Sequence, residues 1–249
     1  MFPWLIAHRG AMVEAPENTR AAFNRALSYP IDGIEFDVQL SRDRVPVVFH
    51  DQELKKINGS RRPIASYDYG ELCRMDWGAW FAESFAGETV LTLEEVLLAY
   101  GTKTRLLVEI KSDGASGSRA MNRFMAQTVP EMIEKDLPKD WIDRIMVLSF
   151  DSDMISTAMA KMPNLKYGLN LKTEKFNVTD WAGDLYAVSL PVHRMTPWFV
   201  DNCHKNGLVV MTYACNTEKT VDAALDMGID VVMTDNPGRI SAHRERWSK

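Results

Sequence analysis

Residues 33–38 read Gly-Ile-Glu-Phe-Asp-Val, and residues 105–111 read Arg-Leu-Leu-Val-Glu-Ile-Lys. Both stretches are mostly apolar, as expected of strands that are buried on both faces of a parallel sheet. Charged side chains enter them near the carboxyl end at alternate positions, and residues two apart share one face of a strand. The pairs that share a face are Glu35 with Asp37 and Glu109 with Lys111. The pattern predicts two buried strands that carry three acids and a lysine to one end of a sheet.

Apolar runs of this length recur along the chain and alternate with segments of helical periodicity. The other runs are 4–8, 145–150, 166–171, 185–190, 208–213 and 230–234. The helical segments are 18–28, 92–100, 118–135 and 153–162, with three more that begin at Thr196, Thr217 and Pro237. Such alternation predicts a parallel sheet covered by helices, and eight strands with eight helices make a closed (β/α)8 TIM barrel. The alternative, an open doubly wound sheet, uses fewer strands.

One region interrupts this alternation. The polar residues 41–44 separate the second run from residues 45–50, which predicts a hairpin rather than a helical crossover. Residues 51–90 then show no clear periodicity and are rich in Gly, Arg and aromatic residues. We interpret residues 41–90 as a small insertion after strand 2 of a single TIM-barrel domain that spans 1–249. Because loops at the carboxyl ends of the strands build the active site of a barrel, the insertion should shape substrate binding.

The composition limits the classes of function. The chain has 249 residues, of which 46% are hydrophobic and 25% charged, as in a globular protein with a buried core. Its net charge of −5 argues against nucleic acid as a partner. No run approaches the roughly 20 apolar residues of a membrane span, and the N-terminus lacks the features of a secretory signal. Three widely spaced cysteines suit a reducing compartment. We expect a cytoplasmic protein without stable membrane association, and the oligomeric state stays open.

The acids predict a metal site, and two histidines predict acid–base chemistry. Charges inside a barrel are costly unless they pair or bind a cation. Carboxylate oxygens suit hard cations such as Mg²⁺ or Ca²⁺, and the lack of thiolates at these positions disfavours structural zinc. His8 and His50 each end an apolar run and precede a charged residue, which makes them candidates for a general acid and base. His193 is a candidate for substrate contact, whereas His204 and His243 are expected on helices without a catalytic role.

The order of these residues resembles the glycerophosphodiester phosphodiesterase family. The N-terminal part of the match comprises His8-Arg9-Gly10, Pro16-Glu17-Asn18-Thr19 with Ala22-Phe23 and Ala26, Ile34-Glu35-Phe36-Asp37-Val38, Ser41-x-Asp43 and His50-Asp51. The later part comprises Glu109-Ile110-Lys111, Ser149-Phe150-Asp151, Asn216, Gly228-Ile229-Asp230, Thr234-Asp235 and Pro237. The match spans nearly the whole chain. The stretch 77–88 is most similar to the bacterial cytosolic branch.

The resemblance implies a TIM barrel that hydrolyses glycerophosphodiesters to sn-glycerol 3-phosphate and an alcohol with the help of a divalent metal, Mg²⁺ before Ca²⁺ or Mn²⁺. It implies that the metal is bound by Glu35, Asp37 and Glu109. It assigns acid–base catalysis to His8 and His50. It assigns phosphate or substrate binding to Arg9, Lys111, Asn18, Phe150 and Asn216. The chain departs from the usual family pattern at Lys56 and Ile57, where Arg and Thr are common, and at 213–215.

Several choices stay open at this level. The residues do not assign base and acid between the two histidines, and the nucleophile is either water or the glycerol hydroxyl next to the phosphate. The preferred head group and the native metal are also open. A related enzyme acting on lysophospholipid or sphingolipid head groups would need an apolar mouth, which the aromatic residues of 77–85 would have to supply. A phosphate-binding barrel without catalysis is a second alternative, although binding alone has no need of a histidine pair.

Overall fold

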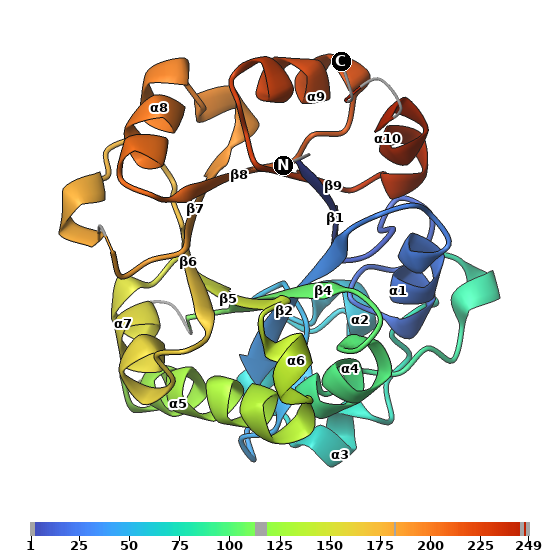
Figure 1. The fold of residues 1–249 in the computed structure, drawn as a ribbon. Helices are drawn as coiled ribbons and strands as arrows, with labels where there is room; N and C mark the ends of the chain where they lie inside the picture. Colours follow the sequence, from blue (N-terminus) through green and yellow to red (C-terminus); the bar gives the residue numbers. More distant parts are fainter. Residues whose placement is uncertain (1–2, 113–118, 182, 245–246, 248–249) are drawn as a thin grey trace.

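The computed structural model describes residues 3–112, 119–181, 183–244 and 247. Eight parallel strands form a closed ring surrounded by helices, which confirms the expected barrel (Figure 1). Neighbours in the ring follow the order β1-β9-β8-β7-β6-β5-β4-β2, and the pairing of β1 with β2 closes it. The ring strands are β1 Trp4–His8, β2 Gly33–Leu40, β4 Arg105–Ile110, β5 Ile145–Ser149, β6 Lys166–Asn170, β7 Ala187–Pro191, β8 Val209–Tyr213 and β9 Val231–Thr234. Strand β3, Pro46–Val48, pairs antiparallel with β2 and forms the expected hairpin.

Helices cover the outside of the ring, and all but the one-turn helix α6 lie at the expected places. They are α1 Arg20–Leu27, α4 Leu93–Tyr100, α5 Arg119–Asp136, α6 Lys139–Ile142, α7 Ser152–Lys161, α8 Pro197–Lys205, α9 Glu218–Asp226 and α10 Pro237–His243. Thr196 and Thr217 cap α8 and α9, because each side chain accepts a hydrogen bond from a backbone N–H of the first turn. Ser118, the expected start of α5, lies outside the described residues. Within the described ranges, no helix combines the length and apolar character that crossing a membrane requires.

The connection between β6 and β7 differs from a regular barrel. Its described residues contain a short 3-10 helix, η4 Val178–Trp181, in place of the eighth α-helix that a regular count predicts. The connection is rich in residues that favour turns, since Asn177 and Asp180 hydrogen-bond locally and Gly183 has a positive φ of 91°. The described residues of this connection therefore join β6 to β7 without a full α-helix.

Side chains of the ring strands alternate between two hydrophobic clusters. Those that face outward, such as Phe36 and Val108, pack against the helices in one large cluster. Those that face the barrel axis form a smaller cluster of Ile6, Leu107, Met146, Leu148, Ala187, Met211, Val231 and Met233. Leu107 belongs to the axial layer, so Glu109, two residues further along β4, also faces inward near the carboxyl end. The alternation expected from the sequence therefore places the charges above an apolar floor.

The insertion has a hydrophobic core of its own. It contains the short helices α2 Lys55–Asn58, η1 Ile64–Ser66, α3 Tyr69–Leu72 and η2 Glu83–Phe85. Its buried side chains are Val47, Phe49, Leu54, Ile64, Leu72, Trp77 and Val90. Trp77 meets Phe49 edge to face, with ring centroids 5.3 Å apart, and donates a hydrogen bond to the Leu72 carbonyl. Trp77 is thus buried in this core, while Trp80 is 36% exposed.

Candidate active site

Strand register brings the acids and one histidine together. His8 of β1 is level with Glu35 of β2, and Asp37 of β2 is level with Glu109 of β4. The strands run parallel, so these inward side chains all emerge at the carboxyl end of the barrel. Carboxylate oxygens of the three acids lie within 4.8 Å of one another, and all three residues are buried. The convergence expected from strand alternation is present in the fold.

Two cations lie against this cluster. The Lys111 ammonium lies 2.8 Å from Asp37 Oδ1 and donates a hydrogen bond to Glu109 Oε1. The Arg9 guanidinium Nε lies 3.2 Å from Asp37 Oδ2, and the Asn18 amide donates a hydrogen bond of 2.9 Å to the same oxygen. Burial alone would raise the pKa of Asp37, but Lys111 and Arg9 outweigh it and hold that pKa well below its usual range. Asp37 is therefore the permanently charged centre of the cluster.

The other two acids have the opposite electrostatics. Burial, together with the negative charge of Asp37, raises the pKa of Glu35 to about 8. The same two causes raise the pKa of Glu109. Three carboxylates thus lie beside two cations, Arg9 and Lys111. With all three carboxylates ionised, the cluster has a net negative charge. A divalent cation would supply the missing positive charge.

The donor set fits a hard divalent metal. Glu35, Asp37 and Glu109 offer only oxygen atoms, the ligand type that Mg²⁺ and Ca²⁺ prefer. Asp37 Oδ1 is buried and accepts no hydrogen bond of good geometry from the described residues, although the Lys111 ammonium is close. Buried oxygens are normally satisfied, so an oxygen of this kind beside two further carboxylates is consistent with a place for a metal ion.

The loop after β1 turns sharply to place Arg9. Arg9 and Gly10 have positive φ angles of 55° and 82°. A Cβ on Gly10 would lie 2.7 Å from the backbone carbonyl carbon of Ala22, which is too close for any other residue. In this turn the Arg9 backbone N–H donates a hydrogen bond of 2.8 Å to the Glu35 carbonyl. The Arg9 side chain points to Asp37. Glycine is required here both by φ and by the approach of α1.

Both candidate catalytic histidines are held by carboxylates through Nδ1. His8 Nδ1 lies 2.6 Å from Asp235 Oδ1, and His50 Nδ1 lies 2.9 Å from Asp51 Oδ1. The other ring nitrogen of His8, Nε2, lies 3.9 Å from Glu35. Burial lowers the pKa of His8, but the hydrogen bond with Asp235 and the charge of Glu35 outweigh burial and raise it. An imidazole that is held through Nδ1 keeps Nε2 available for proton transfer.

These groups line one pocket at the barrel mouth, with a volume of about 460 Å³ that includes space open to solvent. Pockets for small ligands commonly have about 300–1,000 Å³. The polar wall consists of His8, Arg9, Glu35, His50, Glu109, Lys111 and Asn170. The apolar wall consists of Leu148, Phe150, Tyr213 and Met233. This pocket fits a small molecule whose anionic end contacts the polar wall and whose apolar or polyol end contacts the apolar wall.

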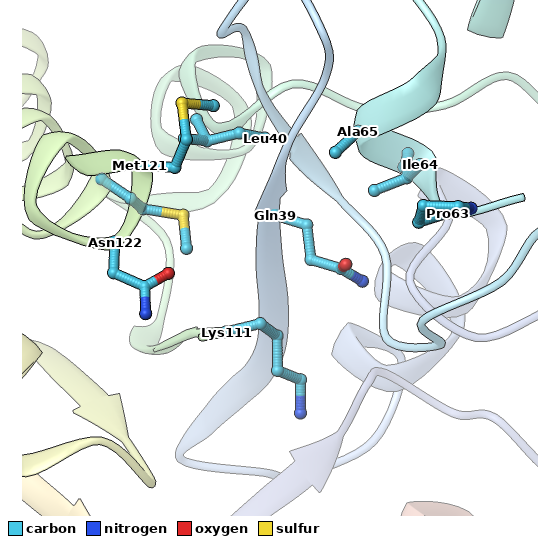
Figure 2. A pocket seen from close by; sticks show the side chains of 9 residues that line it. Gln39, Leu40, Pro63, Ile64, Ala65, Lys111, Met121 and Asn122 are labelled. Atoms are coloured by element: carbon cyan, nitrogen blue, oxygen red, sulfur yellow. The ribbon is translucent and has the colours of Figure 1, made fainter. Parts of the chain in front are cut away.

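A second cleft shares Lys111 with the pocket. Figure 2 shows it between Met121 and Asn122 of α5 and the segment Pro63–Ala65 of the insertion, with Gln39 in the middle. Its volume is about 370 Å³, and Lys111 is the one charged residue among its lining side chains within the described part of the chain. It holds neither a histidine nor a carboxylate, so the chemistry belongs to the first pocket.

Three of the residues expected at the site lie behind the pocket wall. Asp37 and Asn18 are bonded to each other beneath Arg9 and Lys111. Asn216 donates a hydrogen bond of 2.6 Å to Asp235 Oδ2 and accepts one from the Asp235 backbone N–H. Asn216 therefore orders the partner of His8 and lies outside the set that lines the pocket. Phe150 is on the pocket wall and is 38% exposed.

The remaining histidines lie apart from this pocket. His193 is exposed on the short helix η5 Val192–Arg194 and is absent from the pocket lining. His204 pairs with Asp230 at 2.8 Å, and His243 pairs with Asp222 at 2.7 Å. Both of these pairs link a helix to a neighbouring element on the outside of the ring, which agrees with the structural role expected for them.

Two further polar residues contribute to the site. Asp235 follows β9 and holds His8, and Asn170 ends β6 and donates a hydrogen bond of 2.9 Å to Glu109 Oε2. Neither residue was expected to have a role at the site. The signal was present, because both are polar residues at the carboxyl end of an apolar run, the same criterion that selected His8.

Comparison with known proteins agrees with this geometry. A sequence profile of the glycerophosphoryl diester phosphodiesterase family matches residues 8–239. A glycerophosphodiester phosphodiesterase of Caldanaerobacter subterraneus is 31% identical over 94% of this chain and 94% of its own, and one of Bacillus altitudinis is 29% identical over 97% and 98%. A phosphodiesterase of Oleispira antarctica, solved in complex with the product sn-glycerol-3-phosphate, superposes with a TM-score of 0.87 at 26% identity over 98% of this chain and 97% of its own. The chain belongs to the glycerophosphoryl diester phosphodiesterase family, and it is an enzyme of that family.

Proposed function

We propose that this enzyme hydrolyses glycerophosphodiesters to sn-glycerol 3-phosphate and an alcohol by acid–base catalysis of His8 and His50 at a divalent-metal site. The observation that carries the proposal is the presence of both carboxylate-held imidazoles on one pocket with the acidic cluster. The product bound to the Oleispira antarctica relative supports the substrate class. A pure phosphate-binding protein has no need of such a pair.

The pocket supplies positive charge where a phosphodiester would bind. Arg9 and Lys111 lie on its wall and offer guanidinium and ammonium donors to the phosphoryl oxygens. We assign the metal to Glu35, Asp37 and Glu109, and we favour Mg²⁺ because it commonly binds through a few carboxylates together with phosphate oxygens of the substrate. A metal bound there would stabilise the negative charge that builds up on the phosphoryl group. Phe150 lies on the apolar side and is placed to contact the carbon skeleton of the substrate.

The histidines divide the two proton transfers between them. One imidazole takes the proton of the attacking hydroxyl, from water or from the glycerol moiety, and the other donates a proton to the departing alcohol. Asp235 and Asp51 fix the ring orientation by their bonds to Nδ1. Asn216 and Asn18 support this arrangement by holding Asp235 and Asp37 in place. The protein thus needs no covalent nucleophile of its own.

A substrate panel tests the proposal. The purified enzyme is incubated with glycerophosphocholine, glycerophosphoethanolamine and lysophosphatidylcholine, each with Mg²⁺, with Ca²⁺ and after exhaustive chelation. Glycerol 3-phosphate is measured for the two glycerophosphodiesters, and lysophosphatidic acid with choline is measured for lysophosphatidylcholine. We expect release from the two glycerophosphodiesters that depends on metal. Full activity after chelation would remove the metal from the proposal. Turnover of lysophosphatidylcholine alone would favour the lysophospholipid alternative.

We also propose a cytoplasmic location with a small-molecule substrate as the partner and without nucleic acid. Free thiols at Cys73, Cys203 and Cys215 support a reducing compartment. The net charge of −5 supports the exclusion of nucleic acid. Fractionation of cells that express the chain tests the location.

A further inference from the structure

A second group of potential metal ligands lies beside the pocket, outside the acidic cluster. Atoms of Glu17, His50 and Asp51 lie within 4.8 Å of one another. Glu17 belongs to the loop after β1, whereas His50 and Asp51 follow β3 within the insertion. The group therefore joins the barrel to the insertion at the point where the insertion presents a candidate catalytic histidine.

The ammonium of Lys56 is the cation that contacts this group. Lys56 Nζ of α2 lies 2.9 Å from Glu17 Oε1 and 2.9 Å from Asp51 Oδ2. The other oxygen of Asp51 holds His50 Nδ1, and the same oxygen of Glu17 also accepts a hydrogen bond of 3.2 Å from Arg9 Nη1. A continuous chain of hydrogen bonds and ion pairs thus runs from His50 through Asp51, Lys56 and Glu17 to Arg9.

The environment of Lys56 restricts its position. Its ammonium lies 5.0 Å from the ring centroid of Trp80 and 5.8 Å from that of Phe49, within the range of cation–π attraction. Lys56 is 21% exposed at the side chain, compared with 37% for Asp51. Asp51 would otherwise be a half-exposed carboxylate with freedom to rotate, and an exposed ion pair alone contributes little. Lys56 packs against two aromatic rings and contacts two carboxylates at once, so this contact differs from an exposed surface salt bridge.

We propose that Lys56 is a positioning residue. It links Asp51 to Glu17 and thereby fixes the position of the His50 imidazole of the insertion relative to Arg9 of the barrel. The inference rests on the acid–base role proposed for His50. Lys56 itself is absent from the pocket lining, so it acts through Asp51 and does not touch the substrate. Its loss should slow the chemical step more than it weakens substrate binding, because the orientation of a proton-transfer group matters most in the transition state.

The test compares variants of the full-length enzyme on whichever diester of the panel turns over fastest, with Mg²⁺. Lys56→Met keeps the length of the side chain and removes its charge. We expect kcat to fall about 10-fold, the lower range for loss of a group that orients a site residue, with KM within about twofold. Lys56→Arg should recover most of kcat, since a guanidinium can bridge the same two carboxylates. Melting curves of both variants verify that the loss is not due to unfolding.

Two controls separate the explanations. Lys55→Met alters the neighbouring exposed lysine of α2, which forms no ion pair among the described residues, and should keep the wild-type kcat. The double variant Asp51→Asn with Lys56→Met should be no slower than Asp51→Asn alone, because both changes break one chain of contacts. Additive losses, or a rise of KM with unchanged kcat, would overturn the inference.

His50→Ala distinguishes failure of this inference from failure of the proposed function. If His50→Ala is inactive while Lys56→Met has the kcat of Lys55→Met, the positioning role of Lys56 is overturned and the acid–base assignment stands. If His50→Ala retains near-normal activity, the assignment of His50 is overturned and the inference falls with it.

Discussion

His8 Nδ1 and Asp235 Oδ1 lie 2.6 Å apart although 227 positions separate the two residues in the chain. His8 ends β1, and Asp235 directly follows β9, the neighbour of β1 in the ring. The hydrogen bond therefore forms only when the first and last strands of the barrel pair. The orientation of this candidate catalytic imidazole thus depends on the pairing of β1 with β9.

Asp235→Asn tests this dependence. The amide that replaces the carboxylate can no longer stabilise a charged imidazole, and it favours the wrong tautomer when it donates to Nδ1. We expect kcat to fall by about 10–100-fold with a smaller change in KM. Asp222→Asn is the matched control, because Asp222 holds His243 at 2.7 Å outside the site and its loss should leave kcat unchanged. Equal kcat values for the two variants would argue against an orienting role of Asp235.

Removal of either imidazole tests the acid–base pair. His8→Ala and His50→Ala should each lower kcat by about 10²–10⁴-fold, the usual contribution of a general acid or base. Substrate affinity should change less, because Arg9 and Lys111 remain on the pocket wall. Steady-state kinetics with saturating Mg²⁺ provide the measurement, and a near-normal rate in one variant removes that histidine from the mechanism.

Glu35→Gln should stabilise the metal-free protein at pH 8. The pKa of Glu35 is raised from an ordinary value of 4.5 to about 8 in the fold. The unfolded carboxyl loses its proton from about pH 4.5, so the folded state loses stability as the pH rises from there to about 8 and does not regain it above. The neutral amide avoids this cost, and the melting temperature after chelation should rise by about 4 °C or more.

Added metal should reverse that order. Mg²⁺ should raise the melting temperature of the wild type through binding to the folded state. Glu35→Gln lacks one proposed ligand and should respond much less. Thermal melts at pH 5 and pH 8, with and without Mg²⁺, make the comparison, and a wild type that is as stable at pH 8 as the variant after chelation would contradict the raised pKa.

The thiols should react at very different rates. Burial raises the pKa of Cys203 and of Cys215 to about 12, so neither forms appreciable thiolate at pH 8. Cys73 is exposed on the insertion. A disulfide reagent such as DTNB should titrate one thiol rapidly in the native protein and all three after denaturation. Cys73→Ser should abolish the rapid phase, and its persistence would contradict the buried positions of the other two.

Gly10→Ala should destabilise the protein more than Gly59→Ala. Both glycines have positive φ, 82° and 77°, so both substitutions carry the backbone cost of about 1–2 kcal/mol. A Cβ at Gly59 meets nothing within 4 Å, whereas a Cβ at Gly10 meets Ala22 at 2.7 Å. We expect an additional loss of about 1–3 kcal/mol for Gly10→Ala, from denaturant unfolding. Equal losses would show that the loop relaxes away from α1.

Periodicity predicted the strands well because their signal is local. All eight ring strands lie within two residues of the expected runs, and the inward acids follow from alternation within β2 and β4. The hairpin of β2 with β3 was also predicted. The helices of the insertion were not, because each is only one turn long and lacks a periodic pattern. The 3-10 helix before β7 was missed for the same reason.

The sequence by itself determined which charges share a face, since alternation along a buried strand places Glu35 with Asp37 and Glu109 with Lys111 whatever the neighbouring strands are. Only the tertiary structure decided that this face is the axial one, and which groups orient the two candidate catalytic histidines. The contact of His8 with Asp235 requires closure of the ring, and the bridge from Lys56 to Asp51 and Glu17 requires docking of the insertion on the barrel. Neither contact leaves a periodic trace in the chain, because each joins elements whose approach depends on the packing of the whole fold.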